Sequence, residues 1–465
     1  IDLMYEIRDP IHGTISFSDR ERRVIDHPYV QRLRHIRQLG LSYLVYPGST
    51  HDRFSHVTGA MHVVSRIWSR IIETSGDVLK EHFEEFDLEY FHRLLRLAAL
   101  LHDTGHSPFS HVSEKYMPKL KDLDLPEGWM VGADPERQAK HEDYSVMLTA
   151  ALSREKDTPI PPDEAQDIAS LIHHEVLPSP AWEKRYGAIG SGRVGIHRLL
   201  RSFISGELDC DRMDYLLRDA YYTGVAYGAY DRDHLISNLG VTERGGTLVP
   251  TIDSTAVRAF EDFLLARYHM FLQVYLHKTT IAFDHFLDMA MADSELDMKM
   301  PGDADGYARL RDSTVIEMLF GAADRKDNNW SWRLVNRIPP KMLFAASNAN
   351  EEDSILLSKL ESALKKTKVP FFRMDSRQYL SKTAPVGMSD SGSELLVRRK
   401  MFGRIVYEPV ERYSDLLNKY NEVIDQSNIY VLREHYVDAQ GVLKQMGWPV
   451  VGMIGGKQAK IFENF

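Results

Sequence analysis

Apolar residues recur at a spacing of three to four positions through most of the first 290 residues, and this periodicity is what most constrains the fold. Such a pattern predicts helices that each bury one apolar face against their neighbours. The segments that carry it are 30–39, 57–74, 90–101, 141–153, 162–173, 196–204, 211–222 and the long run 255–291. We therefore expect a mainly α-helical bundle.

Short β-hairpins are expected at two places beside the helices. Residues 3–17 place β-branched and aromatic residues on either side of Asp9-Pro10 and His12-Gly13, which is typical of a hairpin. A second hairpin is predicted over 240–252, with its turn at Gly245-Gly246. Between residues 115 and 140 the chain is polar, contains proline and lacks periodicity, which indicates a loop over the helical body.

The pattern changes near residue 300. Met300-Pro301-Gly302 interrupts the helical run, and short helices then alternate with strand-like segments at 369–372 and 403–410. Because 465 residues are too many for one ordinary core, we expect a helical domain over residues 1–300 and a C-terminal α+β domain over 301–465. The glycine-rich tail from residue 450 onward is expected to be peripheral.

Composition and charge argue against several classes of protein. With 43% hydrophobic and 27% charged residues, the chain has the composition of an ordinary globular protein. A net charge of −10 argues against strong nucleic-acid binding, and no apolar run approaches the roughly 20 residues of a membrane helix. The single cysteine, Cys210, excludes an intrachain disulfide and a multi-cysteine zinc site, so we expect a cytoplasmic protein.

Histidines and aspartates fall at the ends of predicted helices. His56 lies near the start of one helix, the pair His102-Asp103 at the end of another, and Asp211 at the start of a third. Imidazole and carboxylate groups bind divalent transition metals and leave positions open for water and substrate. A single helical histidine is most often a packing residue, but several imidazoles close to Gly105 are hard to explain by packing. The four residues predict a metal-dependent phosphohydrolase.

The surrounding motifs point to a family. They are RDPIHG, QRLRHIRQLG, YPGSTHDRFSH, LLHDTGHSPFSH, HE and LDCDRMDYLLRDAYYTGV, in this order between Ile7 and Lys278. Over this stretch the chain resembles the HD-domain deoxynucleoside triphosphate triphosphohydrolases. The resemblance includes no sterile-alpha-motif domain and fades in the C-terminal third.

This resemblance implies a metal centre and a reaction. One transition metal, iron, manganese or zinc, would be held by four ligands, and Mg²⁺ would accompany the triphosphate. Water activated by the metal would attack the α-phosphorus, and the deoxynucleoside would leave inorganic triphosphate behind. A set of histidines with one glutamate would supply the proton for the leaving 5′-oxygen, and which imidazole is the acid stays open. The implied ligands are His56, His102, Asp103 and Asp211, and the implied catalytic set is His106, His111, Glu114 and His141.

The resemblance also implies a substrate site. Two arginines would hold phosphates, two tyrosines would pack on the deoxyribose and exclude a 2′-hydroxyl, and two polar residues would bond the 3′-hydroxyl. Leu276 stands where the family has a polar residue, which puts contacts from its helix, including those of Lys278, in doubt. The implied substrate residues are Arg53 and Arg212 for phosphate, Tyr215 and Tyr275 for the sugar ring, Gln38 and Asp219 for the 3′-hydroxyl, and also Leu39 and Arg267.

An activating nucleotide is implied as well. Asp26, Gln31 and Arg34 stand where relatives recognise guanine at a subunit interface, so activation by GTP or dGTP and a homotetramer or other homo-oligomer are expected. Tyr5 stands where a basic residue would be needed. The alternative is that Asp26 is a helix N-cap and the arginines form a solvated face.

Two other functions stay open. The same four ligands could serve a phosphohydrolase of a nucleoside monophosphate, a cyclic nucleotide or an alarmone, although a simpler phosphatase would not need Arg53, His111, Arg212 and Tyr275. The metal could also be structural in a regulatory or nucleic-acid-binding protein, which the acidic charge and the surplus of histidines disfavour. Cys210 is expected to be a packed bystander and not a nucleophile.

Overall fold

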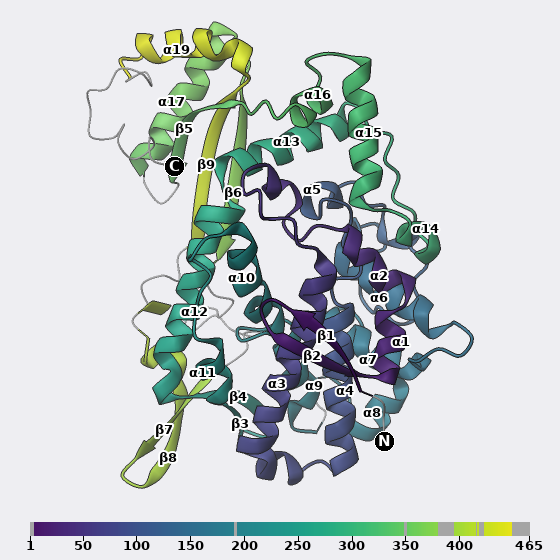
Figure 1. Cartoon of the computed structure of the whole chain (residues 1–465). Coiled ribbons are helices and arrows are strands. Elements are labelled where there is room, and N and C mark those ends of the chain that lie inside the picture. Colours follow the sequence, from purple (N-terminus) through teal and green to yellow (C-terminus); the bar gives the residue numbers. More distant parts are fainter. Residues whose placement is uncertain are drawn as a thin grey trace. The chain divides into compact units, whose positions relative to one another are not determined.

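The computed structural model describes residues 4–189, 193–347, 351–379, 395–414, 416–417 and 423–448. Helices predominate among them, which confirms the predicted fold class (Figure 1). Two compact units interleave along the chain: residues 1–275, 296–318 and 381–421 form the first, and residues 276–295, 319–380 and 422–465 form the second. The expected boundary at residue 300 stays a prediction. None of the described helices is both long and apolar enough to span a membrane.

The core of the first unit is built around α3 (Arg53–Lys80). Helices α4 (Glu85–Leu101) and α10 (Cys210–Thr223) pack directly against it. Each fully buried aliphatic side chain on α3 contributes about 1.5–3 kcal/mol, so this stripe fixes the helix in the bundle. Its residues, all at most 2% exposed, are Val57, Met61, Val64, Ile67, Trp68 and Ile71.

Several other helices complete the first unit. Among them, α6 and α9 begin and end at the residues that the periodicity predicts, and α7 ends one residue earlier than predicted. They are α1 (Asp19–Ile25), α2 (Pro28–Gln31), α5 (His111–Glu114), α6 (His141–Ser153), α7 (Pro162–Ile172), α8 (Pro180–Tyr186), α9 (Ile196–Ile204), α11 (Arg232–Ser237), α12 (Val257–Met270) and α14 (Ala304–Ala308).

The predicted helix over 30–39 is wrong. Helix α2 passes into a 3-10 turn, η1 (Arg32–His35), and Ile36 is then extended with φ −121° and ψ 114°. The carbonyl of Ile36 accepts from the Arg53 N–H at 2.9 Å, and the Gln38 N–H donates to the carbonyl of His51 at 3.0 Å. Tertiary pairing with residues 51–53 therefore replaces the helical hydrogen bonds, and it brings this segment beside the start of α3.

Both predicted hairpins are present. Strands β1 (Met4–Asp9) and β2 (Gly13–Ser18) pair antiparallel, and so do β3 (Leu239–Arg244) and β4 (Thr247–Asp253). Gly245 and Gly246 have φ values of +60° and +76°, which a tight hairpin turn requires and glycine adopts without strain. The second hairpin continues into β7 (Leu396–Met401) and β8 (Arg404–Pro409), in the order β3-β4-β7-β8.

The predicted loop over 115–140 is irregular apart from the turn η3 (Leu120–Asp122). The continuous helix expected over 255–291 is wrong. Helix α12 ends in a π-helical turn, η6 (Phe271–Tyr275), and α13 (Lys278–Ala292) begins anew in the second unit. His277 leaves the helical region with ψ 124°, and its Nδ1 accepts from the Thr279 N–H at 3.2 Å, so this side chain caps α13.

The second unit contains the expected α+β arrangement. Its antiparallel sheet has the order β5-β9-β6, and α17 and α19 supply leucine and valine side chains to the same core. The strand expected at 369–372 begins only at Phe372, because the Val369 N–H still bonds to the Leu364 carbonyl at the end of α17. The tail from residue 450 lies outside the described residues. The remaining elements are α15 (Asp312–Arg325), α16 (Trp330–Val335), β5 (Lys341–Ser347), α17 (Glu351–Thr367), β6 (Phe372–Tyr379), β9 (Val423–Val431) and α19 (Tyr436–Gln445).

Candidate active site

The four predicted metal ligands converge from three helix ends. His56 lies in the first turn of α3, His102 caps the C-terminus of α4 and is followed by Asp103, and Asp211 lies in the first turn of α10. His56 Nε2 is 3.1 Å from Asp211 Oδ1 and 3.7 Å from Asp103 Oδ2. His102 Nε2 is 3.3 Å from Asp103 Oδ1 and 3.7 Å from Asp211 Oδ1. Two nitrogens and two carboxylates thus face one small space.

This donor set fits a divalent metal. The Nε2 atoms of His56 and His102 are buried, and neither has a hydrogen-bond partner among the described residues. His56, His102 and Asp103 also present ligand atoms within 4.8 Å of one another. Mixed imidazole and carboxylate donors suit iron, manganese and zinc. A buried nitrogen without a hydrogen bond is costly, and coordination of an ion would remove that cost.

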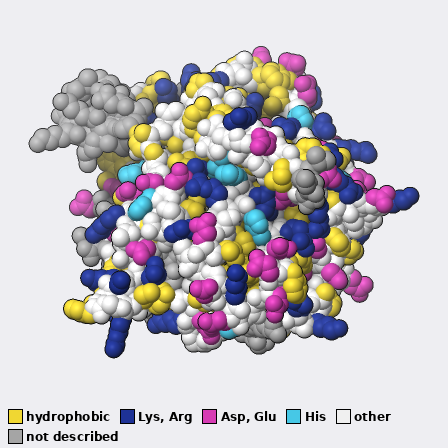
Figure 2. Space-filling model, turned by 60° about the horizontal axis from the view of Figure 1, so that its bottom comes forward, with side chains coloured by type: hydrophobic (Ala, Val, Ile, Leu, Met, Phe, Trp, Pro, Cys, Tyr) yellow, Lys and Arg dark blue, Asp and Glu magenta, His cyan; other side chains and the backbone are white. Residues whose placement is uncertain are grey.

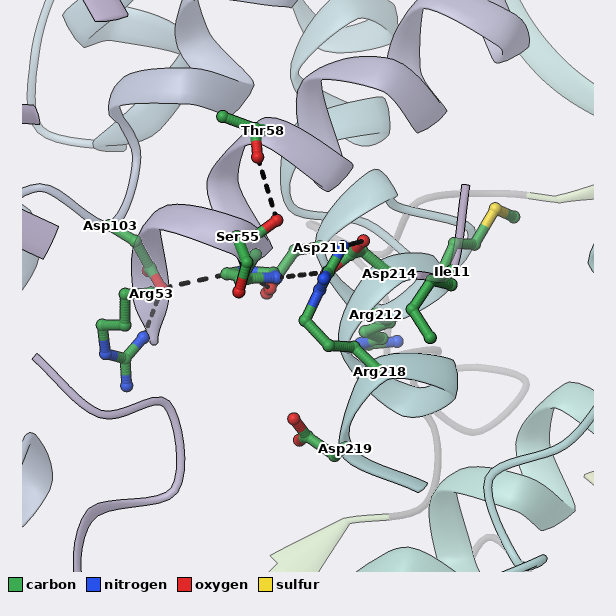
Figure 3. Close-up of polar contacts among 12 residues, drawn as sticks. Ile11, Arg53, Ser55, Thr58, Asp103, Asp211, Arg212, Asp214, Arg218 and Asp219 are labelled. Atoms are coloured by element: carbon green, nitrogen blue, oxygen red, sulfur yellow. Dashed lines mark hydrogen bonds and ion pairs between the residues drawn. The ribbon is translucent and has the colours of Figure 1, made fainter. Parts of the chain in front are cut away.

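A buried aspartate holds His56 in place from behind. Asp214 Oδ2 lies 2.8 Å from His56 Nδ1, and the carboxylate accepts two further bonds of 2.9 Å from Arg218 (Figure 3). Burial raises the pKa of Asp214, but Arg218 and the hydrogen bonds from His12 and His56 outweigh it and hold the pKa well below the ordinary range. The ionised carboxylate accepts from Nδ1 and leaves Nε2 directed at the ligand group.

His12 extends this support by one residue. Its Nε2 lies 2.5 Å from Asp214 Oδ1, and its Nδ1 lies 2.9 Å from Arg232 Nη1. Because arginine can only donate, Nδ1 must accept and the ring proton is on Nε2, facing the carboxylate. Sequence analysis did not predict roles for His12 or Asp214, although both fall inside quoted motifs.

Glycines make the close packing around the centre possible. A Cβ at Gly59 would lie 2.0 Å from Asp214 Oδ1, and a Cβ at Gly105 would lie 2.0 Å from the carbonyl of His141. Gly105 does not have a positive φ, so the glycine is needed there for close approach and not for backbone freedom. The turn after Asp103 can therefore press directly against the start of α6.

Arg53 lies beside the ligand group. Its Nη1 donates to Asp103 Oδ2, and its Nη2 donates to Ser110 Oγ at 2.8 Å. Burial raises the pKa of Asp103, but His102, His106 and Arg53 hold it well below the ordinary range. Ser110 has φ 52° and ψ −121°, an unfavourable backbone conformation of the kind that clusters at functional sites. A fixed positive charge thus lies next to a proposed ligand.

The predicted catalytic set forms a second cluster that shares Asp103. The rings of His106 and His141 stack with their centroids 4.0 Å apart, and His106 Nε2 is 3.3 Å from Asp103 Oδ1. Glu114 Oε1 accepts from the backbone N–H of His141 at 2.9 Å and lies 2.8 Å from its Nδ1, while Glu114 Oε2 lies 3.1 Å from His111 Nδ1. All four predicted residues therefore lie together.

The imidazoles of this cluster have different protonation tendencies. Burial, Arg53 and His141 lower the pKa of His106 well below its ordinary value. Burial also disfavours the cation at His141, but the hydrogen bond to Glu114 outweighs it and raises the pKa of that ring. The side chain of His111 is 74% exposed. The set thus contains His106, which is buried and neutral, His141, which favours its protonated form, and His111, which is open to solvent. Such a combination suits proton transfer to a leaving group.

The predicted sugar residues follow one face of α10. Asp211, Tyr215 and Asp219 are spaced by four residues, so their side chains project from the same side of the helix. The ring of Tyr215 lies with its centroid 6.5 Å from that of His56 and 6.2 Å from that of Tyr275. The Tyr275 hydroxyl donates to Asp219 Oδ2 at 2.7 Å. One continuous surface therefore leads from the ligands to this tyrosine.

Two arginines lie close to each other near Tyr215. Burial and the charge of Arg212 both lower the pKa of Arg267. Arg212 is only 3% exposed, its nearest carboxylates are 3.6 and 3.8 Å away, and its Nη2 has no hydrogen-bond partner in the described part of the chain. Like charges held together at a buried place favour an anionic ligand there.

The remaining predicted substrate residues are less informative. Gln38 Oε1 is buried without a hydrogen-bond partner in the described ranges. The backbone N–H of Gln38 donates to the carbonyl of His51, and His51 Nε2 lies 2.7 Å from Asp219 Oδ1. Leu39 packs against the core of the first unit. Lys278 begins α13, which belongs to the second unit.

The predicted activator residues lie at the surface near the end of α1. Arg34 Nε donates to Gln31 Oε1 at 2.8 Å, and the Arg34 guanidinium lies over the ring of Phe54. The Asp26 carboxylate accepts from Arg22. Asp26 is the C-cap of α1 and not an N-cap, because His27 occupies the N-cap position of α2, so the N-cap part of that alternative is wrong, whereas Arg34 is exposed as it expects.

Cys210 and Tyr5 have ordinary structural surroundings. Burial, Asp209 and Asp211 raise the pKa of the Cys210 thiol well above its usual value, which makes the thiolate inaccessible at neutral pH. The Tyr5 hydroxyl donates to Asp19, and its ring packs under Arg22.

Comparison with known proteins identifies the domain that carries this site. A model of the HD domain matches residues 53–219. An uncharacterized protein of Methanocaldococcus jannaschii is 27% identical over 96% of this chain and 88% of its own length. The crystal structure of a hypothetical protein from Aquifex aeolicus matches with a TM-score of 0.68 at 26% identity, and the match covers 95% of this chain and 100% of that chain. The chain therefore contains an HD domain, and HD domains bind divalent metals.

The chain is also similar to one group of enzymes. The deoxynucleoside triphosphate triphosphohydrolase SAMHD1 of Homo sapiens is 27% identical over 69% of this chain. The chain spans about half the length of this relative, 51%. The mouse protein of the same name is 31% identical over 48% of the chain.

Proposed function

We propose that the chain hydrolyses deoxynucleoside triphosphates to a deoxynucleoside and inorganic triphosphate. The observation that carries this proposal is the surface of α10, where Asp211, Tyr215 and Asp219 lead from the proposed metal ligands to Tyr275. A phosphatase of simple monophosphates would need neither this row of side chains nor two buried arginines beside it. The names of the similar SAMHD1 proteins support the same substrate.

The proposed division of labour follows from the contacts. His56, His102, Asp103 and Asp211 would hold a transition metal, which when bound supplies Lewis acidity and activates water. Two arginines, Arg212 and Arg267, would hold the triphosphate, and Arg53 would add positive charge beside the α-phosphate. Mg²⁺ would accompany the phosphates.

The protein's own proton donor would come from the second cluster. Glu114 holds His141 and His111 through separate carboxylate oxygens, so either ring could deliver a proton to the leaving 5′-oxygen. The stacked His106 keeps the neighbouring ring in place. Packing of Tyr215 and Tyr275 on the sugar would exclude a 2′-hydroxyl.

The test is product analysis. Purified protein is incubated with each deoxynucleoside triphosphate and each ribonucleoside triphosphate under Mn²⁺ or Mg²⁺, and the products are separated by chromatography. We expect deoxynucleoside plus triphosphate, with much slower turnover of ribonucleotides. Release of a nucleoside diphosphate and phosphate would overturn the proposal. So would exclusive turnover of monophosphates, cyclic nucleotides or alarmones, which are included as competing substrates.

We propose further that GTP or dGTP activates a homo-oligomer, with a tetramer as the first expectation. Gln31 and Arg34 bond each other on an exposed surface, where a guanine could replace their mutual contact. Turnover with and without GTP, together with native mass spectrometry, tests this. The Gln31→Ala variant is expected to lose activation while keeping basal turnover, and equal activation of both proteins would contradict the proposal.

We propose that the chain does not bind nucleic acid strongly. The net charge is −10, and Figure 2 displays a face on which basic and acidic side chains are interspersed. Strong binding of nucleic acid would need a broad positive field. An electrophoretic mobility assay at physiological salt would reveal any such binding.

A further inference from the structure

A second cavity lies apart from the proposed metal centre. It has a volume of about 470 Å³, within the range of small-molecule sites, and is formed by the hairpin β1–β2 and by α1, α3 and α4. None of the predicted metal, catalytic or substrate residues is among the described residues that line it. The lining residues are Met4, Thr14, Ser16, Ser18, Arg20, Glu21, His62, Ser65, Glu89, His92, Arg93, Arg96 and Leu97.

Three guanidinium groups are fixed in its wall. Arg96 bonds both carboxylate oxygens of Glu21, and Arg20 and Arg93 share the carboxylate of Glu164. Three cations are therefore held by two carboxylates, and Arg93 uses its Nε for that contact while it also lines the cavity. The other acid in the lining, Glu89, is exposed to solvent, which weakens its field.

Two imidazoles add neutral hydrogen-bond donors. His62 has no hydrogen bond to any residue that the structure describes, and the Nε2 of His92 lies 2.8 Å from Ser65 Oγ. Burial, His12 and Arg66 lower the pKa of His62 to about 4, and burial and Arg96 do the same for His92. Both rings are therefore neutral near pH 7, and the surroundings of His62 are electrically positive.

We propose that this cavity binds a small molecule that carries a phosphate group. The hydroxyls of Thr14 and Ser16, the free imidazole of His62 and the guanidinium of Arg93 offer several donors to one anion. Phosphate oxygens are strong acceptors that suit such a set. Because the volume exceeds that of a bare phosphate, the ligand is a phosphate ester with an organic part against Met4 and Leu97.

The cavity lies beside His12, which helps to hold the proposed metal ligand His56 in place. The ring of His62 lies with its centroid 5.2 Å from that of His12, and His12 bonds the aspartate that holds His56. A ligand that contacts His62 would therefore act on His12, and through Asp214 on the orientation of His56. The site is placed to regulate metal binding from outside the active site.

The test separates this cavity from the active site, which would also attract phosphate. Pyrophosphate and glycerol 3-phosphate are titrated calorimetrically into metal-depleted protein that carries Asp211→Ala. We expect glycerol 3-phosphate to bind this variant, and we expect His62→Phe and Arg93→Gln each to weaken that binding about tenfold. Arg70→Gln, which removes a half-buried arginine elsewhere on α3, is the matched control and should bind normally.

Two results would overturn the proposal. One is the loss of all binding in the Asp211→Ala protein, which would place the anion at the metal centre. The other is unchanged affinity in both His62→Phe and Arg93→Gln. Because Arg93 is partly exposed, Arg93→Gln is expected to fold normally, and its thermal midpoint is compared with that of Arg70→Gln to establish this.

Discussion

Two clusters of imidazoles meet at Asp103, and they are built in opposite ways. His56 and His102 project from helix ends, are almost fully buried, and point unpaired nitrogens at two carboxylates. The second cluster lies on the turn after α4 and at the start of α6, and its His111 is largely exposed. A buried and fixed group of ligand atoms suits a permanently bound ion, whereas a group that is partly exposed to solvent suits the exchange of protons. The shared aspartate places the two functions side by side.

The largest effect on the contrast between the two clusters is expected from the removal of one proposed metal ligand. We expect Asp211→Ala to lose its bound transition metal and to hydrolyse the substrate at least about 10³-fold more slowly, since a metal supplies several kcal/mol of transition-state stabilisation. Metal content is measured by inductively coupled plasma mass spectrometry. Chelation of the unmodified protein should reproduce the loss, and readdition of Mn²⁺ should reverse it.

The control for this variant is Asp233→Ala, which removes an exposed acid from α11. It should retain both metal and turnover. Full metal content in Asp211→Ala would show that this aspartate is not a ligand.

Removing a ring from the second cluster should separate metal binding from turnover. We expect His111→Gln or His141→Gln to lower kcat by about 10²-fold with unchanged metal content, because a general acid contributes to the chemical step alone. The variant with the larger loss identifies the acid. Steady-state kinetics and metal analysis are made on the same samples.

His174→Gln, which changes an exposed histidine outside the cluster, serves as the control. Unchanged kcat in both cluster variants would remove the proposed proton donor. Loss of metal from them would mean that the two clusters are not separate in function.

Residue type and position at predicted helix ends indicated the four metal ligands, whereas the second cluster and the substrate residues were expected from the family resemblance alone. Helical periodicity located the ends of α4 and α10, and a ligand at a helix end needs little else to be placed. The spacing of Asp211, Tyr215 and Asp219 likewise follows from the period of one helix.

Predictions from the sequence failed where contacts between distant segments determine the conformation. Residues 36–38 leave the helical conformation because they pair with residues 51–53, and the helix after Tyr275 is broken by a capping histidine. The link from His12 to Asp214 joins residues more than 200 positions apart, and neither side chain has a pattern that reveals it. The cavity beside the hairpin depends in the same way on packing between separate elements.

The hydrogen bonds from His12 through Asp214 to His56 offer a test of whether they hold this proposed ligand in position. We expect His12→Phe to weaken metal binding by about 10–100-fold, as loss of an outer partner of a metal ligand commonly does. His12→Gln should recover part of this affinity, since an amide N–H can still donate to Asp214. Competition with a coloured chelator gives the affinities, and Co²⁺ spectra report any change in ligand geometry.

Rescue by glutamine distinguishes orientation from simple packing. Equal metal affinity in both His12 variants and the unmodified protein would show that the outer chain does not position His56. The thermal midpoints of the two variants are compared so that a folding defect is recognised.

The smallest expected effect concerns the far end of the α10 surface. Tyr275→Phe keeps the ring but removes the hydroxyl that donates to Asp219 at 2.7 Å. One such hydrogen bond contributes about 1 kcal/mol, so kcat/KM for a deoxynucleoside triphosphate should fall about fivefold with metal content unchanged. Because the ring still occupies the place of a 2′-hydroxyl, the preference for deoxyribose over ribose should persist. A loss of that preference in Tyr275→Phe would assign sugar selection to the hydroxyl network around Asp219, and no change in either quantity would mean that the sugar binds away from this surface.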